Sequence, residues 1–371
     1  MALQININSQ NLVKPSKSRS AKHFLKGESK IDKLESRSGS RKALADIVNR
    51  DPLQQITTSS IKREPSDKSL PVKHVQDIPV LPSGVHDIDA EDEENPQLCT
   101  EYAPLMYAYL RQLEQDQPIR KDFLKNCHVN GKMRGVLLDW LVEVHLQFKL
   151  LQETLYMAIF IIDRFLQVEG LTLKRNRFQL IGVSAMFIAS KVEEMYAPEI
   201  NDFVYITDDA YSAAEIRKTE LRILQVLNFG INRPLPLHFL RRFSKAGDVD
   251  IMQHTLAKYL VELSQIEYDL SHLPPSQVAA SSLYLSLLIL TPGANLDVWN
   301  LNLQHYSCYE SKDLLPTVCR IAVILQKAPE GKLKAVYTKY CEKKFMRIAS
   351  CNELKVDIVA KLASKHLNSI A

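Results

Sequence analysis

The most constraining feature of the sequence is the apolar stretch MRGVLLDWLVEVHLQF at residues 133–148. At helical spacing its apolar side chains cover most of the circumference, and Asp139, Glu143 and Gln147 form one narrow polar stripe. A helix that is apolar on nearly all sides belongs in the middle of a helix bundle. Arg134 interrupts the apolar surface, and a charge in such a helix needs a partner or an exit to water.

Composition places the chain among soluble globular proteins, since 46% of its 371 residues are apolar and 24% are charged. The net charge of +4 is too small to indicate nucleic-acid binding. The chain has only 11 glycines, and so low a count disfavours an all-β fold or a Gly-rich nucleotide-binding loop. The six cysteines have no C-x-x-C spacing, which predicts reduced thiols in an intracellular protein. Neither a signal peptide nor a bilayer-spanning run is present, so we expect no membrane association.

Residues 1–96 differ from the rest in being rich in Ser, Lys, Arg, Asp and Asn, and Phe24 is their only aromatic residue. Such a segment buries too little apolar surface to offset the entropy of ordering, so we expect it to be disordered. Its basic first part and the acidic run Asp87–Glu94 are interpreted as solvated charges.

Two short strings stand out within this tail. Residues 41–49 form a small apolar island between polar flanks, which is typical of a docking peptide in a disordered segment. Residues 61–64 have the apolar-Lys-x-Glu form of a SUMO acceptor at Lys62, a pattern so short that chance also produces it.

From residue 97 onward the pattern is helical. Tyr102, Met106 and Tyr109 lie on one face of a short helix, with Pro104 in its first turn. The further predicted helices span residues 133–148, 154–168 and 177–194, followed by a helix that begins at the capping box of Ser212 and Glu215 and runs to Leu227.

Small residues are concentrated in two of the apolar segments, 177–194 and 274–290. Small side chains let neighbouring helices approach closely, so each segment is a candidate central helix. The two segments occupy similar places in successive runs of helices. We therefore expect two five-helix bundles built to one plan.

Several long strings resemble those of mitotic B-type cyclins, in the same order and spacing: MRGVLLDWLVEVH, IIDRFL, AMFIASKVEEMYAPEINDF, LNFGINRPLPLHFLRR and QHTLAKYLVELSQIEYDLSHLPPSQVAA. The resemblance implies an all-α fold of two tandem five-helix cyclin boxes, preceded by a short helix and a disordered tail. It divides the chain into a regulatory tail (1–96), the N-terminal helix and first box (97–232), and the second box with a C-terminal segment (233–371).

The same resemblance implies an activating subunit that forms a heterodimer with a mitotic cyclin-dependent kinase, without catalytic residues, cofactor or metal of its own. The residues that match the family's kinase contacts are Lys191, Glu220, Leu224, Phe229, Ile188, Tyr102, Met106 and Tyr109. Val192 stands where many cyclins carry an aromatic residue. An ordinary exposed ion pair is the alternative interpretation of Lys191 and Glu220.

A substrate-docking groove is also implied by the resemblance. Its residues would be Met133, Val136, Leu137 and Trp140 for the leucine of an Arg-x-Leu peptide, Glu143 for the arginine, and Gln179 for the peptide backbone. Core packing is the alternative for Leu137 and Trp140. Arg134 and Asp163 match a structural ion pair between the first two helices of the box.

In the tail, Arg41, Leu44 and Asn49 match the destruction box of mitotic cyclins, which implies ubiquitin-dependent destruction through the anaphase-promoting complex. The resemblance also implies residence in the cytoplasm and nucleus. The tail has no Ser-Pro or Thr-Pro pair, so proline-directed phosphorylation there is not expected.

Three other classes of protein fit less well. A transcription-factor-like relative of the same fold would carry a zinc ribbon and strongly basic helices, and the sequence has neither. A plain helical scaffold would not need Lys191 and Glu220 at those positions. An enzyme would carry a catalytic motif such as H-E-x-x-H, a G-K-[ST] loop or a nucleophile elbow, and none is present.

Overall fold

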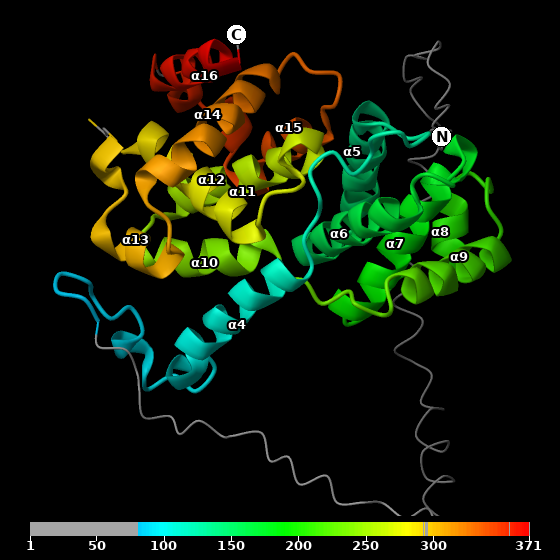
Figure 1. Cartoon of the computed structure of the whole chain (residues 1–371), viewed down its shortest axis with the longest axis horizontal. Coiled ribbons are helices and arrows are strands. Elements are labelled where there is room, and N and C mark those ends of the chain that lie inside the picture. Colours follow the sequence, from blue (N-terminus) through cyan, green and yellow to red (C-terminus); the bar gives the residue numbers. More distant parts are fainter. Residues whose placement is uncertain (1–80, 292, 294–295, 356, 371) are drawn as a thin grey trace, which may run out of the picture. The chain divides into compact units, whose positions relative to one another are not determined.

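The computed structural model describes residues 81–291, 293, 296–355 and 357–370, and this part of the chain is helical, with no strand (Figure 1). The predicted all-α fold of two tandem five-helix bundles is confirmed. None of the helices in the described ranges has the length and hydropathy needed to cross a membrane.

A first helix and the first bundle occupy residues 103–226. They comprise α4 (Ala103–Asp116), followed by α5 (Gly131–Phe148), α6 (Gln152–Glu169), α7 (Phe178–Glu193), α8 (Ile200–Ile206) and α9 (Ala213–Val226). Pro104 lies in the first turn of α4, and the capping box of Ser212 and Glu215 begins α9, as the sequence predicts.

The second bundle follows the Arg233–Pro234 linker. Its helices are α10 (Pro236–Ala246), α11 (Ile251–Ile266), α12 (Pro275–Leu290), α13 (Leu301–Ser307) and α14 (Ser311–Lys327). Two further helices, α15 (Ala335–Tyr340) and α16 (Asp357–Ile370), come after the bundle and were not individually predicted.

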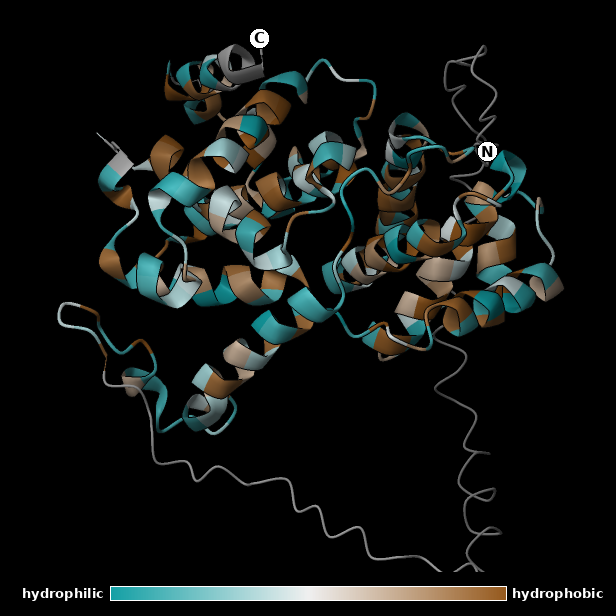
Figure 2. Cartoon of the chain, viewed as in Figure 1, coloured by the Kyte–Doolittle hydropathy of each residue, from teal (hydrophilic) through white to brown (hydrophobic). Residues whose placement is uncertain are grey.

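Helices α5 and α7 pack closely in the first bundle because α7 carries small residues at the contact. A Cβ atom at Gly182 would lie 2.8 Å from the side chain of Leu137, so any larger residue there would displace this buried leucine. Hydrophobic residues accordingly run through α5, α6 and α7, whereas α9 alternates between hydrophobic and hydrophilic turns (Figure 2). The predicted central position of residues 133–148 and 177–194 agrees with this burial.

Arg134 forms the buried centre of the junction between the bundles. Its side chain is 1% exposed and donates to both carboxylate oxygens of Asp163 on α6, each at 2.6 Å. It also donates to the carbonyls of Gln265 and Ile266, at 3.0 and 3.2 Å, at the end of α11. The family resemblance implied the pair of Arg134 with Asp163, within the first bundle. The structure shows that Arg134 also binds the carbonyls of the second bundle.

A second buried polar network crosses the same junction. Lys339 on α15 donates to both carboxylate oxygens of Glu262 on α11, at 2.7 and 2.9 Å, and lies 3.2 Å from His145 on α5. Gln152 on α6 donates to the same carboxylate at 2.7 Å. Burial, followed by the positive charges of Lys339 and Lys344, lowers the pKa of His145 to about 3, so its imidazole is neutral at physiological pH.

The end of the predicted disordered tail differs from the structure. Within the acidic run Asp87–Glu94, Asp89 is buried in an ion pair with Arg242, which lies 153 residues further along the chain. The interpretation of this carboxylate as solvated was wrong, because a local charge pattern does not reveal so distant a partner. Residues 1–80 lie outside the described part of the chain.

We expect Arg134→Ala to lower the free energy of unfolding by about 3–5 kcal/mol, because it leaves Asp163 buried without a partner. Urea unfolding followed by circular dichroism measures this. As a control, Arg177→Ala removes an exposed pair with Glu215 and should change the free energy of unfolding far less. Equal losses in the two variants would contradict a structural role specific to Arg134.

Candidate functional site

Lys191, in the last turn of α7, is held by two neighbours. Its ammonium donates to Oε1 of Glu220 on α9 and lies 4.2 Å from the centroid of the Phe187 ring. The lysine side chain is 42% exposed and the glutamate side chain is 15% exposed. Glu220 and Phe187 therefore fix the ammonium of Lys191 in place. Because an ammonium has three protons, it still has N–H donors to offer to a partner.

Apolar residues surround this pair at the surface. Leu224 is half-buried one turn beyond Glu220, and Val192 is exposed next to Lys191. Phe229 is 64% exposed in the turn after α9, where its backbone adopts a left-handed conformation with φ of 57°. We call these residues, together with Lys191 and Glu220, the Lys191 surface.

Two observations change the predicted membership of this surface. Ile188 is only 3% exposed, so it supports α7 from within and cannot offer contact area, because α7 is packed on nearly all sides. Met195 and Tyr196, which directly follow α7, are almost fully exposed. The sequence analysis did not single them out, although two large apolar side chains before Pro198 were a readable signal.

Helix α4 contributes a second exposed apolar face. Tyr102, Met106 and Tyr109 are all exposed, as is Leu105 beside them. The end of α4 lies near the turn that carries Phe229, since Gln117 donates to Asn232 at 2.7 Å. Figure 1 shows α4 leading toward this part of the first bundle. The structure therefore links the two predicted groups of kinase contacts through the chain segment at residues 228–232.

The predicted docking residues on α5 differ in how much of each side chain is exposed to solvent. Val136 is exposed and Met133 is half-buried, so both reach the surface. Trp140 is 7% exposed and Leu137 is 0% exposed. Leu137 cannot line a groove, because it packs into the α5–α7 crossing at Gly182. Its core-packing interpretation holds, and the available surface is smaller than the sequence suggested.

Two polar groups border this surface. Burial raises the pKa of Glu143, and the nearby charge of Asp139 raises it further. Gln179, at the start of α7, is buried, and its Nε2 makes no hydrogen bond to any described residue. A buried N–H without an acceptor is costly, so Gln179 carries an unsatisfied hydrogen-bond donor in the free chain.

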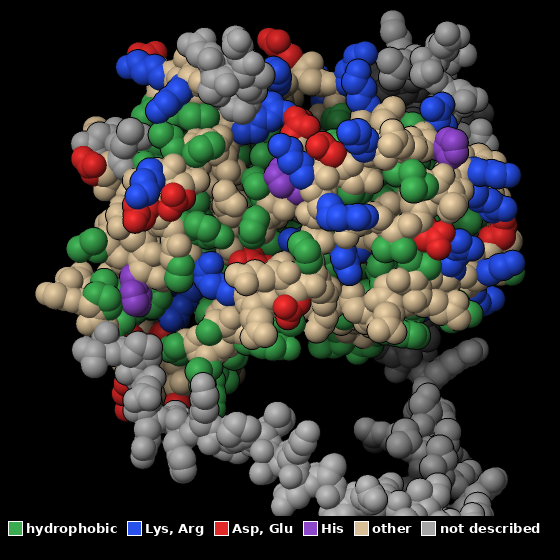
Figure 3. Space-filling model, in the orientation of Figure 1, with side chains coloured by type: hydrophobic (Ala, Val, Ile, Leu, Met, Phe, Trp, Pro, Cys, Tyr) green, Lys and Arg blue, Asp and Glu red, His purple; other side chains and the backbone are tan. Residues whose placement is uncertain are grey.

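Charged side chains of both signs are mixed on the visible face of the molecule. Figure 3 shows Lys and Arg side chains interspersed with Asp and Glu over the visible face, in keeping with the small net charge. Within the described ranges, no group of three or more His, Cys, Asp or Glu side chains is placed to hold a metal. Arg41, Leu44, Asn49 and Lys62 lie outside those ranges.

Comparison with protein families gives two matches in tandem. The model described as "Cyclin, N-terminal domain" matches residues 105–232, and "Cyclin, C-terminal domain" matches residues 234–354. The first match ends after α9 and the second begins just before α10, so each covers one of the two bundles.

Curated relatives resemble the chain over most of its length. A G2/mitotic-specific cyclin-B1 from Oryzias latipes is 48% identical over 288 residues, covering 77% of this chain and 70% of the relative. A G2/mitotic-specific cyclin-B from Patella vulgata is 50% identical over 278 residues, covering 75% and 67%. A G2/mitotic-specific cyclin-B2 from Gallus gallus is 49% identical over 290 residues, covering 78% and 71%.

Among solved structures, the viral cyclin of herpesvirus saimiri has the same fold, with a TM-score of 0.52 at 19% identity. The match covers 62% of this chain and 99% of that one. Two tandem family matches and relatives near 50% identity agree with the observed pair of five-helix bundles. The chain therefore belongs to the cyclin family, among its B-type G2/mitotic members, which are regulatory subunits of protein kinases and not enzymes themselves.

Proposed function

We propose that this chain forms a heterodimer with a mitotic cyclin-dependent serine/threonine kinase and activates it through the Lys191 surface. The observation that carries the proposal is the position of Lys191: it is fixed by Glu220 and Phe187, and it retains free protons beside exposed apolar residues. Those protons are suited to main-chain carbonyls at the end of a partner helix, where carbonyls lack partners of their own.

The mechanism is a population shift in the kinase. In its resting form the regulatory helix is rotated outward and the catalytic Lys–Glu pair is broken. A surface that binds only the inward form stabilises it by the difference between its affinities for the two forms. The position of Lys191, held in the free chain by Glu220 and Phe187, supports such a role.

Replacing Lys191 and Glu220 together by alanine should reduce stimulation of the kinase by at least about tenfold, equivalent to 1.4 kcal/mol of coupling. Histone phosphorylation by the purified kinase measures this. The variant should remain folded, because an exposed ion pair contributes at most about 1 kcal/mol to stability.

Lys218→Ala is the matched control, since it removes an exposed lysine from α9. It should stimulate the kinase as the unsubstituted chain does. Full stimulation by the Lys191 and Glu220 double variant would refute the assignment.

We further propose that the α5 surface recruits substrates that contain Arg-x-Leu. Met133 and Val136 supply apolar contact for the leucine, and Glu143 accepts from the arginine. Gln179 would donate to the peptide backbone, as the family resemblance implies. Its Nε2 is buried and unpartnered in the free chain, so the side chain would have to turn outward to reach a peptide carbonyl.

Substituting Met133→Ala together with Glu143→Gln should raise KM for Arg-x-Leu substrates by about tenfold, the effect of losing 1.4 kcal/mol of binding. Short peptides without the motif should keep their KM, and kcat should not change for either class. These positions are preferable to Trp140, whose truncation would cost about 3–5 kcal/mol of stability.

Gln147→Ala serves as the control, being an exposed residue on the same polar stripe of α5. It should leave both substrate classes unaffected. If the Met133 and Glu143 variant impaired both classes equally, α5 would have no docking role.

We propose in addition that the tail directs ubiquitin-dependent destruction by the anaphase-promoting complex, through Arg41, Leu44 and Asn49. The spacing of these residues and the B-type family support this, and the segment lies outside the described structure. Residence in the cytoplasm and nucleus is proposed with it, since the six cysteines form no disulfide.

Arg41→Ala with Leu44→Ala should lengthen the half-life of the full chain in mitotic extract several-fold, measured by immunoblot after translation is blocked. Leu34→Ala with Arg37→Ala changes the same residue types nearby and should leave the half-life unaltered. Unchanged decay of the Arg41 and Leu44 variant would point to a different degron.

A further inference from the structure

The segment at residues 86–92, which we call the anchor segment, is bound to the second bundle. The His86 amide donates to Oδ1 of Asn302 at 2.9 Å, and the Ile88 amide donates to the Tyr306 hydroxyl at 3.2 Å. That hydroxyl in turn donates to the His86 carbonyl at 2.9 Å. Asn302 and Tyr306 both lie on α13, so this helix holds the backbone of the anchor segment.

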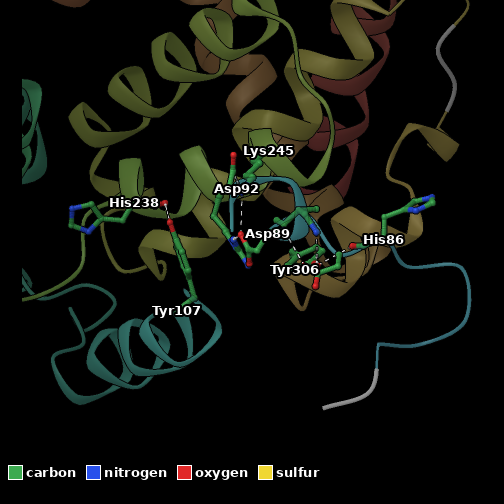
Figure 4. Close-up of polar contacts among 10 residues, drawn as sticks. His86, Asp89, Asp92, Tyr107, His238, Lys245 and Tyr306 are labelled. Atoms are coloured by element: carbon green, nitrogen blue, oxygen red, sulfur yellow. Dashed lines mark hydrogen bonds and ion pairs between the residues drawn. The ribbon is translucent and has the colours of Figure 1, made fainter. Parts of the chain in front are cut away.

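Asp89 in the anchor segment is bound by Arg242 on α10. Figure 4 shows Asp89 with Lys245, on the same helix as Arg242, beside its carboxylate. The two guanidinium Nη atoms donate to the two carboxylate oxygens, with 2.6 Å between Nη2 and Oδ2. The guanidinium lies between two aromatic rings, 5.1 Å from the Tyr107 centroid and 5.0 Å from the Tyr306 centroid. Lys245 adds a 3.1 Å contact to Asp89.

The charge state of Asp89 follows from these contacts. Burial alone would raise its pKa, but hydrogen bonds and positive charge from Arg242, and then from Lys245, lower it overall. Asp89 is therefore ionised at neutral pH, and its bonds to Arg242 are charge-assisted.

Tyr107 connects this ion pair to α4. Besides covering Arg242, it donates to the His238 carbonyl at 3.1 Å. Two later residues on the same face of α4 are also bound to the second bundle. Arg111 lies 5.3 Å from the Tyr309 ring centroid, and Glu114 accepts from the Ser276 amide at 3.0 Å and from its hydroxyl at 2.6 Å.

The spacing of Tyr107, Arg111 and Glu114 places them on one side of α4, and the exposed Met106 and Tyr109 lie on the other. One face of α4 is thus held by the second bundle, and the opposite face remains free for a partner. A helix of 14 residues is marginal in isolation, so its order depends on this attachment.

We propose that the Asp89–Arg242 pair is a clamp that fixes α4 before the kinase binds, and that both are positioning residues acting through α4 without touching the kinase. The proposal rests on the proposed function, in which Tyr102, Met106 and Tyr109 contact the kinase. A helix ordered in advance avoids the entropy cost of ordering at binding, so loss of the clamp weakens the complex.

The test uses the full chain with Asp89→Asn, which keeps the side-chain shape and removes the charge. Arg242→Lys is a milder second variant that keeps the charge but loses the two-pronged bond. Glu93→Gln is the matched control, because Glu93 is an exposed carboxylate close by in the sequence. Thermal unfolding establishes that each variant remains folded.

Dissociation from the kinase, measured by surface plasmon resonance, should be about tenfold faster for Asp89→Asn and unchanged for Glu93→Gln. Combined with Tyr109→Ala, Asp89→Asn should add little further acceleration, because both act through α4. Combined with Lys191→Ala, the two effects should multiply, as expected of independent contacts. If Asp89→Asn only lowered the overall stability of the chain, its effect on the dissociation rate would be the same in both double variants.

Hydrogen exchange of the free variants gives an independent result. Amides at residues 105–110 should exchange faster in Asp89→Asn than in Glu93→Gln, with those of α12 unchanged in both. Dissociation at the unsubstituted rate, or unaltered exchange in α4, would overturn the clamp. Failure of the unsubstituted chain to bind any kinase would instead refute the proposed function, and exchange in α4 would still decide whether the clamp orders the helix.

Discussion

The buried guanidinium of Arg134 is the interaction on which the rest of the structure depends. It satisfies the carboxylate of Asp163 and also the last carbonyls of α11, so one side chain joins two helices of the first bundle to the second bundle. A charge in this position is tolerable only because each of the three guanidinium nitrogens has an acceptor. Lys339 and Glu262 repeat the arrangement from α15 to α11, with His145 and Gln152 as their neighbours in the first bundle. Each buried ion pair lies on one side of the junction, and the further hydrogen bonds of Arg134 and Glu262 connect the two sides.

This rigidity has a functional consequence through α7. The helix carries Gln179 near its start and Lys191 in its last turn, so the proposed docking and kinase surfaces are built on opposite ends of one buried rod. Gly182 lets α5, the helix that carries Met133 and Val136, approach α7 closely at Leu137. An activating subunit must present a rigid surface to the kinase. A flexible surface could adapt to the inward and outward forms alike and would bind both equally. The proposed clamp would make α4, the N-terminal helix, rigid in the same way before the kinase binds.

Much of the fold could be predicted from local patterns. The capping box at Ser212, the proline in the first turn of α4 and the small residues of α7 each determine a helix end or a close contact through short-range physics. Resemblance to a family supplied the positions of Lys191 and Glu220, and the structure shows them hydrogen-bonded across 29 residues. The depth of Ile188 and Leu137 could not be predicted, because an apolar residue on a mostly apolar helix has no signal for which side faces solvent. Asp89 was misread for a related reason: its partner Arg242 belongs to another bundle, and no periodicity connects them.

The central claim is that the free chain already has the shape that selects the active kinase. Its most direct test is the affinity of the chain for the kinase trapped in each of its two forms, with the regulatory helix held inward or outward by an engineered cross-link. The account predicts that the inward form binds at least about a hundredfold more tightly, because a ligand shifts an equilibrium only by its differential affinity. Equal affinity for the two forms would contradict it.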